Sequence, residues 1–231
     1  MGIPERYLRN TNTLSQAECA ALQEKRVCIV GCGGLGGHII DTLGRLGVGR
    51  LTIVDGDVFE PSNLNRQLVS RESFLGKSKA LSAAEYMKDV NSDIEVTPVQ
   101  AFFTEENAAD ILAGQDLIMD ALDSIKARRL LQEKCEERGI PIVHGAVSGW
   151  NGQVSVIYPG DRSFDRIYPS FASDEPYDPK TSPGNPSFIP PFVASLQCAE
   201  AVKVLLRRDG VLRKKLLFAD LSQHQYITID L

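Results

Sequence analysis

The chain has 231 residues, of which 43% are hydrophobic and 24% charged, a composition that suits one larger α/β domain with a packed core. Its formal net charge of -5 argues against a general nucleic-acid binder, which needs a basic face to neutralise phosphates. No apolar stretch approaches the roughly 18 residues of a transmembrane helix, and the first residues contain no apolar signal segment. We therefore expect a cytoplasmic protein that does not associate with membranes.

The cysteines are odd in number and form no CxxC pair, so neither a disulfide framework nor a four-cysteine zinc site is expected. We expect reduced side chains that pack in the interior at Cys19, Cys28, Cys32, Cys135 and Cys198. The histidines are scattered, and we expect structural roles for His38, His144 and His224.

Helices and strands alternate in the predicted secondary structure through residue 147. In chain order we expect a helix at 14–24, a strand at 26–30, a helix ending near residue 46, a strand at 51–54, irregular chain at 56–76, a helix at 77–90, a strand at 94–99, a short helix at 105–113, a strand at 116–121, a helix at 125–138 and a strand at 141–147. This alternation predicts an α/β fold with a doubly wound, mostly parallel sheet of the Rossmann-like kind.

The composition changes after residue 147. Residues 152–158 alternate like a half-exposed strand, and residues 159–191 carry eight prolines and little periodicity, which predicts a long loop. A helix at 192–207 and two short strands within 215–231 complete an antiparallel extension. We therefore expect a single domain over 1–231, with a nucleotide-binding core at 1–147 and a C-terminal part at 148–231.

The segment GCGGLG fits the GxGxxG pattern through Gly31, Gly33 and Gly36, directly after a strand and before a helix. Such a loop lets the backbone approach a phosphate at the amino end of the helix. Asp55, at the end of the next strand, stands where an acid accepts hydrogen bonds from ribose hydroxyls. This combination predicts a nucleotide site and leaves both NAD and ATP open.

Two cations beyond the ribose acid favour ATP. The segment DGDVFEPSNLNRQLVSRESFLGKSK contains Arg66 and Lys79, and a triphosphate site needs such charges because negative charge builds up as pyrophosphate leaves. Asp123, at the end of a later strand, is placed to hold Mg²⁺ among phosphate oxygens.

Taken together, these residues resemble the ThiF/MoeB/HesA family, the bacterial relatives of ubiquitin-activating enzymes. The resemblance covers nearly the whole chain and rests on RYLRN, GCGGLG, DGD, SNLNRQ, GKSKA, ALDS and SLQCAEAVKVLL. It implies an ATP-dependent adenylyltransferase that converts a carboxylate and ATP to an acyl-adenylate and pyrophosphate.

The resemblance also implies roles for individual residues. The nucleotide would contact Gly34, Asp55, Asp57, Asn63, Arg66, Lys79 and Ser124. Asp123 would bind Mg²⁺ and be essential for adenylation. Arg9, in RYLRN, looks like the arginine that reaches the partner subunit's site, which implies a homodimer with two shared sites.

The sequence departs from the family pattern in its cysteines. Most members hold a structural zinc with two CxxC pairs, but residues 136–197 contain no cysteine. We therefore expect no zinc site. If the substrate is a carrier protein, we expect no covalent intermediate between that carrier and the enzyme on the proline-rich loop at 159–191, and we expect this loop to cross near the carrier's C-terminal tail.

The expected substrate is a small ubiquitin-like sulfur carrier of the ThiS or MoaD type that ends in Gly-Gly and serves thiamine or molybdopterin synthesis. Within adenylation, a carboxylate on a small molecule or on a tRNA base stays open, although the acidic balance argues against tRNA. From other classes, an NAD(P)-dependent oxidoreductase and an inactive binding scaffold also stay open.

Overall fold

The computed structural model describes residues 3–169, 181 and 183–231. The strands are β1 (Arg26–Val30), β2 (Arg50–Val54), β3 (Glu95–Val99), β4 (Leu117–Asp120), β5 (Ile142–Ser148), β6 (Asn151–Ile157), β7 (Lys215–Asp220) and β8 (Gln225–Asp230). The α-helices are α1 (Gln16–Gln23), α2 (Gly34–Leu46), α3 (Lys79–Val90), α4 (Glu105–Ile111), α5 (Ile125–Arg138), α6 (Ser163–Ile167) and α7 (Ile189–Leu205). Short 3₁₀-helices are η1 (Glu5–Asn10), η2 (Pro61–Asn63) and η3 (Glu72–Phe74).

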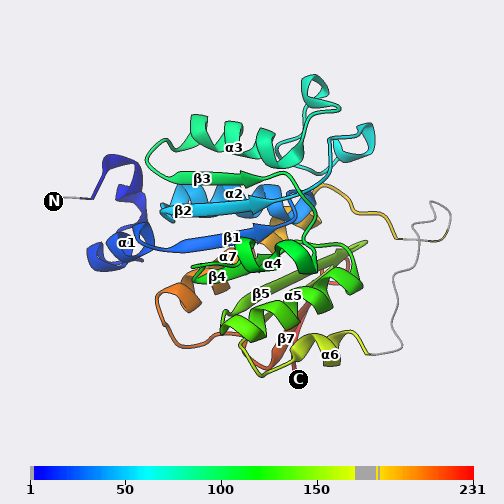
Figure 1. Ribbon diagram of the computed structural model, residues 1–231. Coiled ribbons are helices and arrows are strands. Elements are labelled where there is room, and N and C mark those ends of the chain that lie inside the picture. The colour runs from blue at the N-terminus through cyan, green and yellow to red at the C-terminus, as the bar shows by residue number, and fades with distance from the viewer. Residues whose placement is uncertain (1–2, 170–180, 182) are drawn as a thin grey trace.

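All these strands belong to one sheet in the order β3-β2-β1-β4-β5-β6-β7-β8 (Figure 1). Strands β1 to β5 pair parallel with one another, whereas the β5–β6, β6–β7 and β7–β8 pairs are antiparallel. The predicted α/β fold with an antiparallel C-terminal extension is therefore confirmed. The sheet runs without a break from the nucleotide-binding part into the C-terminal part, because β5 pairs with β6.

Helices cover both faces of the parallel half of the sheet. Helices α2, α3 and α7 bury one face, and α4 and α5 lie over the other face (Figure 1). Strands β1 and β4 are buried on both faces, and this explains their uninterrupted apolar sequences. The elements predicted through residue 147 are confirmed to within about two residues at most ends.

Local sequence signals set several helix ends. Ser15 and Glu18 form a capping box at the start of α1, with the Ser15 hydroxyl accepting from the Glu18 N–H and the Glu18 carboxylate accepting from the Ser15 N–H. Gly47 adopts a left-handed conformation with φ of 89° and ends α2.

The predicted boundaries after residue 158 need correction. The stretch expected to be a loop at 159–191 contains α6, and α7 begins at Ile189 rather than at residue 192. Pro190 and Pro191 fit the first turn of α7 because the backbone there needs no N–H donor. The rest of the predicted loop, at 170–180 and 182, lies outside the described residues.

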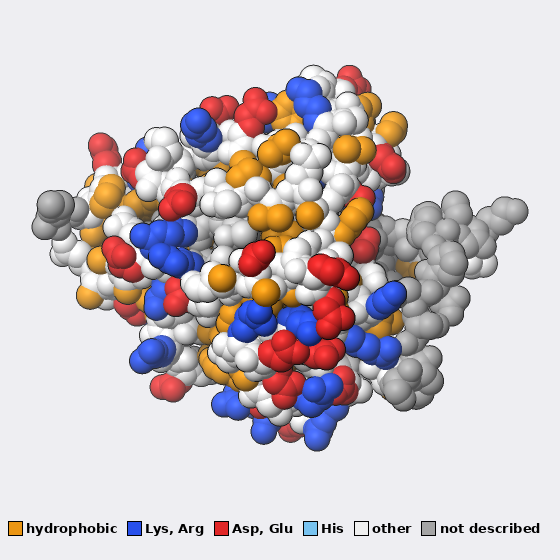
Figure 2. All heavy atoms as spheres, viewed as in Figure 1, with side chains coloured by type: hydrophobic (Ala, Val, Ile, Leu, Met, Phe, Trp, Pro, Cys, Tyr) orange, Lys and Arg blue, Asp and Glu red, His pale blue; other side chains and the backbone are white. Residues whose placement is uncertain are grey.

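All five cysteines are free and buried, as expected from their number and spacing. Burial raises the pKa of the Cys135 and Cys198 thiols to about 12, so both are protonated and unreactive at neutral pH. Over the described part of the chain, no helix is long and apolar enough to cross a membrane. The face shown in Figure 2 intersperses acidic and basic side chains, without a continuous basic area.

Candidate active site

A cavity lined by the glycine loop lies where the strand order reverses. The chain passes from β1 to β2 and β3 on one side and then returns to β4 on the other side of β1, so the turns after β1 and β4 diverge. A cavity of about 330 Å³ opens there, at the carboxyl ends of the parallel strands. Parallel sheets bind their ligands at such switch points.

Glycines allow the loop after β1 to pack tightly against the turn after β4. Gly31 has a φ of 100°, and a Cβ atom at this position would lie 2.5 Å from the carbonyl oxygen of Ala121. A Cβ atom at Gly36 would lie 1.8 Å from the carbonyl oxygen of Gly31. The first turn of α2 therefore packs directly on the loop, and its amino end faces the cavity.

Asp55 ties the end of β2 to the glycine loop. Its carboxylate accepts the backbone N–H of Cys32 at 2.7 Å and that of Asp57 at 2.8 Å. Burial raises the pKa of Asp55, while these two N–H groups and Lys79 act in the opposite direction. The carboxylate is half-buried at the cavity wall, as an acid that binds a ribose would be.

Lys79 and Arg66 reach the same cavity from the segment after β2. Lys79 is the first residue of α3, and its ammonium group lies 3.1 Å from the Asp57 carboxylate. The lysine side chain is only 9% exposed, whereas Asp57 is 54% exposed, so the aspartate is the partner that solvent reaches. Arg66 donates to the Ser62 carbonyl, and its stem passes over Gly34 at the start of α2.

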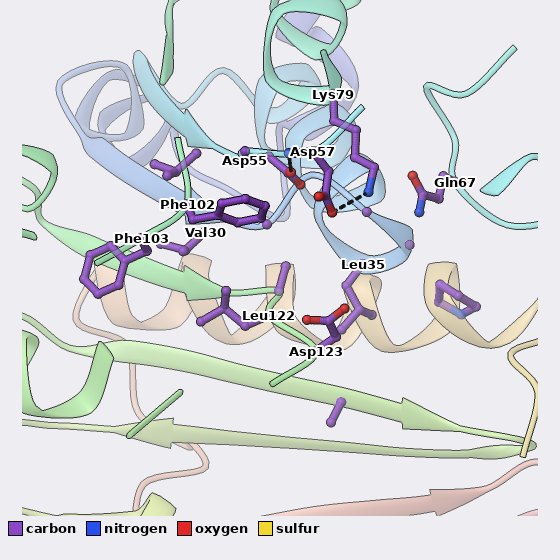
Figure 3. Close-up of a pocket in the computed structure, with 18 of the residues that line it drawn as sticks. Val30, Leu35, Asp55, Asp57, Gln67, Lys79, Phe102, Phe103, Leu122 and Asp123 are labelled. Atoms are coloured by element: carbon purple, nitrogen blue, oxygen red, sulfur yellow. Dashed lines mark hydrogen bonds and ion pairs between the residues drawn. The ribbon is translucent and has the colours of Figure 1, made fainter. Parts of the chain in front are cut away.

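Asp123 faces these groups from the opposite wall. Figure 3 shows Asp55, Asp57 and Lys79 on the β2 side of the cavity and Leu122 with Asp123 on the β4 side. The Asp123 side chain is exposed. The cavity therefore collects the candidate residues Gly31, Gly33, Gly34, Asp55, Asp57, Arg66, Lys79 and Asp123.

Four candidate residues do not line this cavity. Gly36 is buried behind the loop, and the Asn63 side chain is turned into a local cap, where its oxygen accepts the Glu60 N–H. Ser124 is the N-cap of α5 and borders a neighbouring groove. Arg9 is exposed on η1, which packs against the end of α2 at the amino ends of the strands, away from the cavity (Figure 1).

The structure adds residues that the sequence analysis missed. Phe102 is 63% exposed, and its ring lies against Gly56, where a Cβ atom would come within 2.7 Å of the ring. Gln67 is buried, and its Oε1 atom has no hydrogen-bond partner among the described residues. Arg128 lines the cavity from α5. Gln67 directly follows a predicted phosphate contact, but no local pattern marks Phe102 or Arg128.

The cavity continues into an open groove of about 1,190 Å³ that is lined by η2, the start of α5 and strands β5 and β6. The two share Arg66, Asp123 and Arg128 among their lining residues. The rest of the groove wall is mostly small or uncharged, with amide and hydroxyl side chains from η2, β5 and β6. A substrate in the groove would therefore meet the cavity at Asp123.

Residues 7–231 match the ThiF family. The chain belongs to the ThiF family. It is 36% identical to the SAMP-activating enzyme E1 of Haloferax volcanii over 208 residues, which are 90% of this chain and 77% of that protein. It is 34% identical to the adenylyltransferase and sulfurtransferase MOCS3 of Dictyostelium discoideum, covering 94% of this chain and 52% of that protein. The chain thus spans about half the length of this relative.

Solved structures show the same fold. The PaaA crystal structure superposes with a TM-score of 0.81 at 20% identity, covering 98% of this chain and 72% of that chain. Escherichia coli MccB, crystallised with ATP, superposes with a TM-score of 0.81 at 19% identity, covering 99% of this chain and 71% of that chain. As a ThiF-family member the chain is an adenylyltransferase, and the oxidoreductase that the glycine loop alone left open is not supported.

No cluster of three or more His, Cys, Asp or Glu side chains able to hold a metal occurs in the described ranges of this ThiF-family chain.

The contact between Gly36 and Gly31 predicts a stability effect. We expect Gly36→Ala to lower the free energy of unfolding by about 1–3 kcal/mol or more, because the new methyl group must displace backbone. Denaturant unfolding measures this. Gly184→Ala is the matched control, since a Cβ atom there would meet no atom of the described residues within 4 Å. Equal stability of both variants would contradict the tight packing.

Proposed function

We propose that this adenylyltransferase uses Mg·ATP to activate the C-terminal carboxylate of a small ubiquitin-like sulfur carrier that ends in Gly-Gly. The observation that carries the proposal is the cavity itself. Three carboxylates and three cations line a single space that opens into a groove with hydroxyl and amide side chains in its wall. The printed names of the relatives, a SAMP-activating enzyme E1 and MOCS3, support the same class of substrate.

The proposed nucleotide orientation follows from the order of groups along the cavity. With the ribose at Asp55, the triphosphate extends toward the start of α2, Arg66 and Lys79, where the helix dipole and both cations favour anions. The base then points the other way, toward the exposed ring of Phe102 and the apolar side chains of Val30 and Leu122 (Figure 3).

Asp123 suits a magnesium ion, because Mg²⁺ prefers oxygen ligands and is commonly held by one or two carboxylates together with phosphates. The carboxylate is exposed and faces Lys79 and Asp57 across the cavity. When bound, Mg²⁺ would neutralise charge that develops on the phosphates.

The carboxylate substrate would approach through the groove. Its oxygen would attack the α-phosphorus, the bond to the β,γ-pyrophosphate would break, and acyl-adenylate and pyrophosphate would form. Arg66 and Lys79 would stabilise the leaving pyrophosphate, and Arg66 lies at the junction of groove and cavity. The small and amide-bearing groove wall suits an extended glycine-rich tail, whose backbone needs hydrogen-bond partners and little side-chain space.

We also propose a homodimer. Five large apolar side chains on the segment after β2 are between 38% and 49% exposed, namely Val58, Leu64, Leu68, Leu75 and Leu81. Exposed apolar groups gathered on one segment are typical of a subunit interface. Within one chain Arg9 lies away from the cavity, so only a second copy could bring this residue to it.

We expect Asp123→Ala to lower carrier-dependent ATP–pyrophosphate exchange by on the order of 10²-fold or more, because the Mg²⁺ that would neutralise the charge developing on the phosphates loses its carboxylate ligand. The variant should unfold like the wild type, since the side chain is exposed. Asp110→Ala, an exposed aspartate on α4, is the matched control. Unchanged exchange in Asp123→Ala would contradict the assigned role.

We expect Phe102→Ala to weaken ATP binding by about 5- to 150-fold, because base stacking on an aromatic ring contributes about 1–3 kcal/mol. Binding of inorganic tripolyphosphate, which has no base, should not change. Isothermal titration of both ligands measures the difference. Tyr226→Ala, 55% exposed on β8, is the control. If the variant binds ATP and tripolyphosphate more weakly by the same factor, Phe102 does not contact the base.

Mixing inactive variants tests the shared sites. If Arg9 serves the partner's cavity, a dimer of one Arg9→Ala and one Asp123→Ala subunit retains one intact site. After the subunits have re-paired at random, we expect about one quarter of the wild-type ATP–pyrophosphate exchange activity. Half of the dimers are then mixed, and each mixed dimer has one intact site of two. If Arg9 served its own subunit, the mixture would stay inactive.

A further inference from the structure

A buried ionic network lies directly behind the turn that carries Asp123. Asp120, the last residue of β4, is fully buried, and its Oδ2 atom lies 3.2 Å from the Arg128 Nε atom and 2.7 Å from the His144 Nδ1 atom. Burial acts to raise the pKa of Asp120, but Arg128 and His144 outweigh it and hold the pKa below its usual range. A buried carboxylate of this kind is tolerated only because it is paired.

His144 extends the network toward β6. Burial lowers the pKa of His144, so the ring is neutral at physiological pH. Its Nδ1–H then donates to Asp120, and its Nε2 atom accepts from the Gln153 amide at 3.1 Å. The ring also meets the edges of Phe164 and Tyr168 at centroid distances of 5.0 and 5.7 Å.

The same network binds both backbone polar groups of Leu122, the residue before Asp123. The Leu122 N–H donates to the Asp120 Oδ1 atom at 3.0 Å, and the Arg128 Nη2 atom donates to the Leu122 carbonyl. Asp123 is the next residue, and its side chain is exposed to the cavity. The direction of the Asp123 carboxylate therefore depends on where the Arg128 guanidinium sits.

Tyr168 fixes the outer end of that guanidinium. Its hydroxyl accepts from the Arg128 Nη1 atom at 3.1 Å and from the Gln153 amide at 3.0 Å, and the guanidinium carbon lies 5.3 Å from the ring centroid. The backbone at 168–169 is held in turn by Arg129, which donates to the carbonyls of Tyr168 and Pro169. Tyr168 and Gln153 also border the groove.

We propose that Tyr168 is a positioning residue for Asp123. Its hydroxyl holds Arg128, Arg128 holds the Leu122 carbonyl, and the turn therefore presents the Asp123 carboxylate to the cavity in one orientation. The proposal rests on the proposed function, in which Asp123 binds Mg²⁺ with ATP. It assigns a part in metal binding to Tyr168, a residue of the groove wall that does not line the nucleotide cavity.

The test is the Tyr168→Phe variant, which removes one hydroxyl and keeps the ring contacts. ATP affinity is measured by isothermal titration with and without Mg²⁺. We expect the Mg²⁺-dependent gain in ATP affinity to fall about tenfold, the loss typical of a hydrogen bond to a charged group, while Mg²⁺-free ATP binding stays unchanged. A purely structural role would lower the melting temperature without separating the two affinities.

Three further variants sharpen the result. Tyr158→Phe is the matched control, because Tyr158 also lies under an arginine, Arg213, at 4.7 Å but away from Asp123. Arg128→Lys keeps the positive charge beside Asp120 but removes the planar guanidinium that contacts both Leu122 and Tyr168. We therefore expect the Mg²⁺-dependent gain in ATP affinity to fall at least as much as in Tyr168→Phe. Asp123→Ala should abolish the Mg²⁺-dependent gain.

The positioning role of Tyr168 and the metal-binding role of Asp123 can be overturned by different results. A full Mg²⁺-dependent gain in Tyr168→Phe, with loss of the gain in Asp123→Ala, overturns the positioning role alone. A wild-type protein that binds ATP equally with and without Mg²⁺ overturns the metal role of Asp123, and the positioning role with it.

Discussion

The close contact between the glycine loop after β1 and the turn after β4 is the constraint on which the cavity depends. Gly31 lies against the Ala121 carbonyl, and Gly36 lies against Gly31, with no room for a side chain at either position. This contact brings the amino end of α2 beside the carboxyl end of β4. Groups that follow β2 and β4 therefore face each other across one space, although β1 separates the two strands in the sheet.

The charges around that space are only partly neutralised by one another. Lys79 is paired with Asp57, and Asp55 accepts two backbone N–H groups, but Asp123 stands exposed on the opposite wall. Phosphates entering near α2 would meet the helix amino end, Arg66 and Lys79. The arrangement therefore favours an anion on one side of the cavity and a cation on the other, as a metal–nucleotide complex requires.

The antiparallel extension makes the second half of the site. Because β6 pairs with β5, the sheet continues past the parallel core and supplies a wall for the groove. The buried network around Asp120 joins this wall to the cavity through α5, since Arg128 contacts both the turn after β4 and Tyr168. The groove and the nucleotide cavity are thus connected by polar contacts as well as by open space.

Much of the cavity follows from local sequence. A strand, a glycine loop and a helix place Gly31 and Gly33 at the carboxyl edge of the sheet, and Asp55 and Asp123 follow strands that are parallel to β1. Parallel strands end on the same edge, so these residues could be assigned to one cavity before any contact was known. The positive charges of Arg66 and Lys79, beyond the expected ribose acid, predicted that both face the same phosphates, and the structure brings both cations to the cavity.

Side-chain direction and distant packing needed the tertiary structure. Asn63 turns into a local cap, and Arg9 lies at the amino ends of the strands, because hydrogen bonds within η2 and packing of η1 on α2 decide their positions. Phe102 and Arg128 enter the cavity from elements whose sequences show no nucleotide-binding pattern. The sequence by itself determined the order of elements and the strand ends, which depend on periodicity and glycine. The tertiary structure alone decided which side chains meet, since contacts between distant segments depend on packing of the whole sheet and its helices.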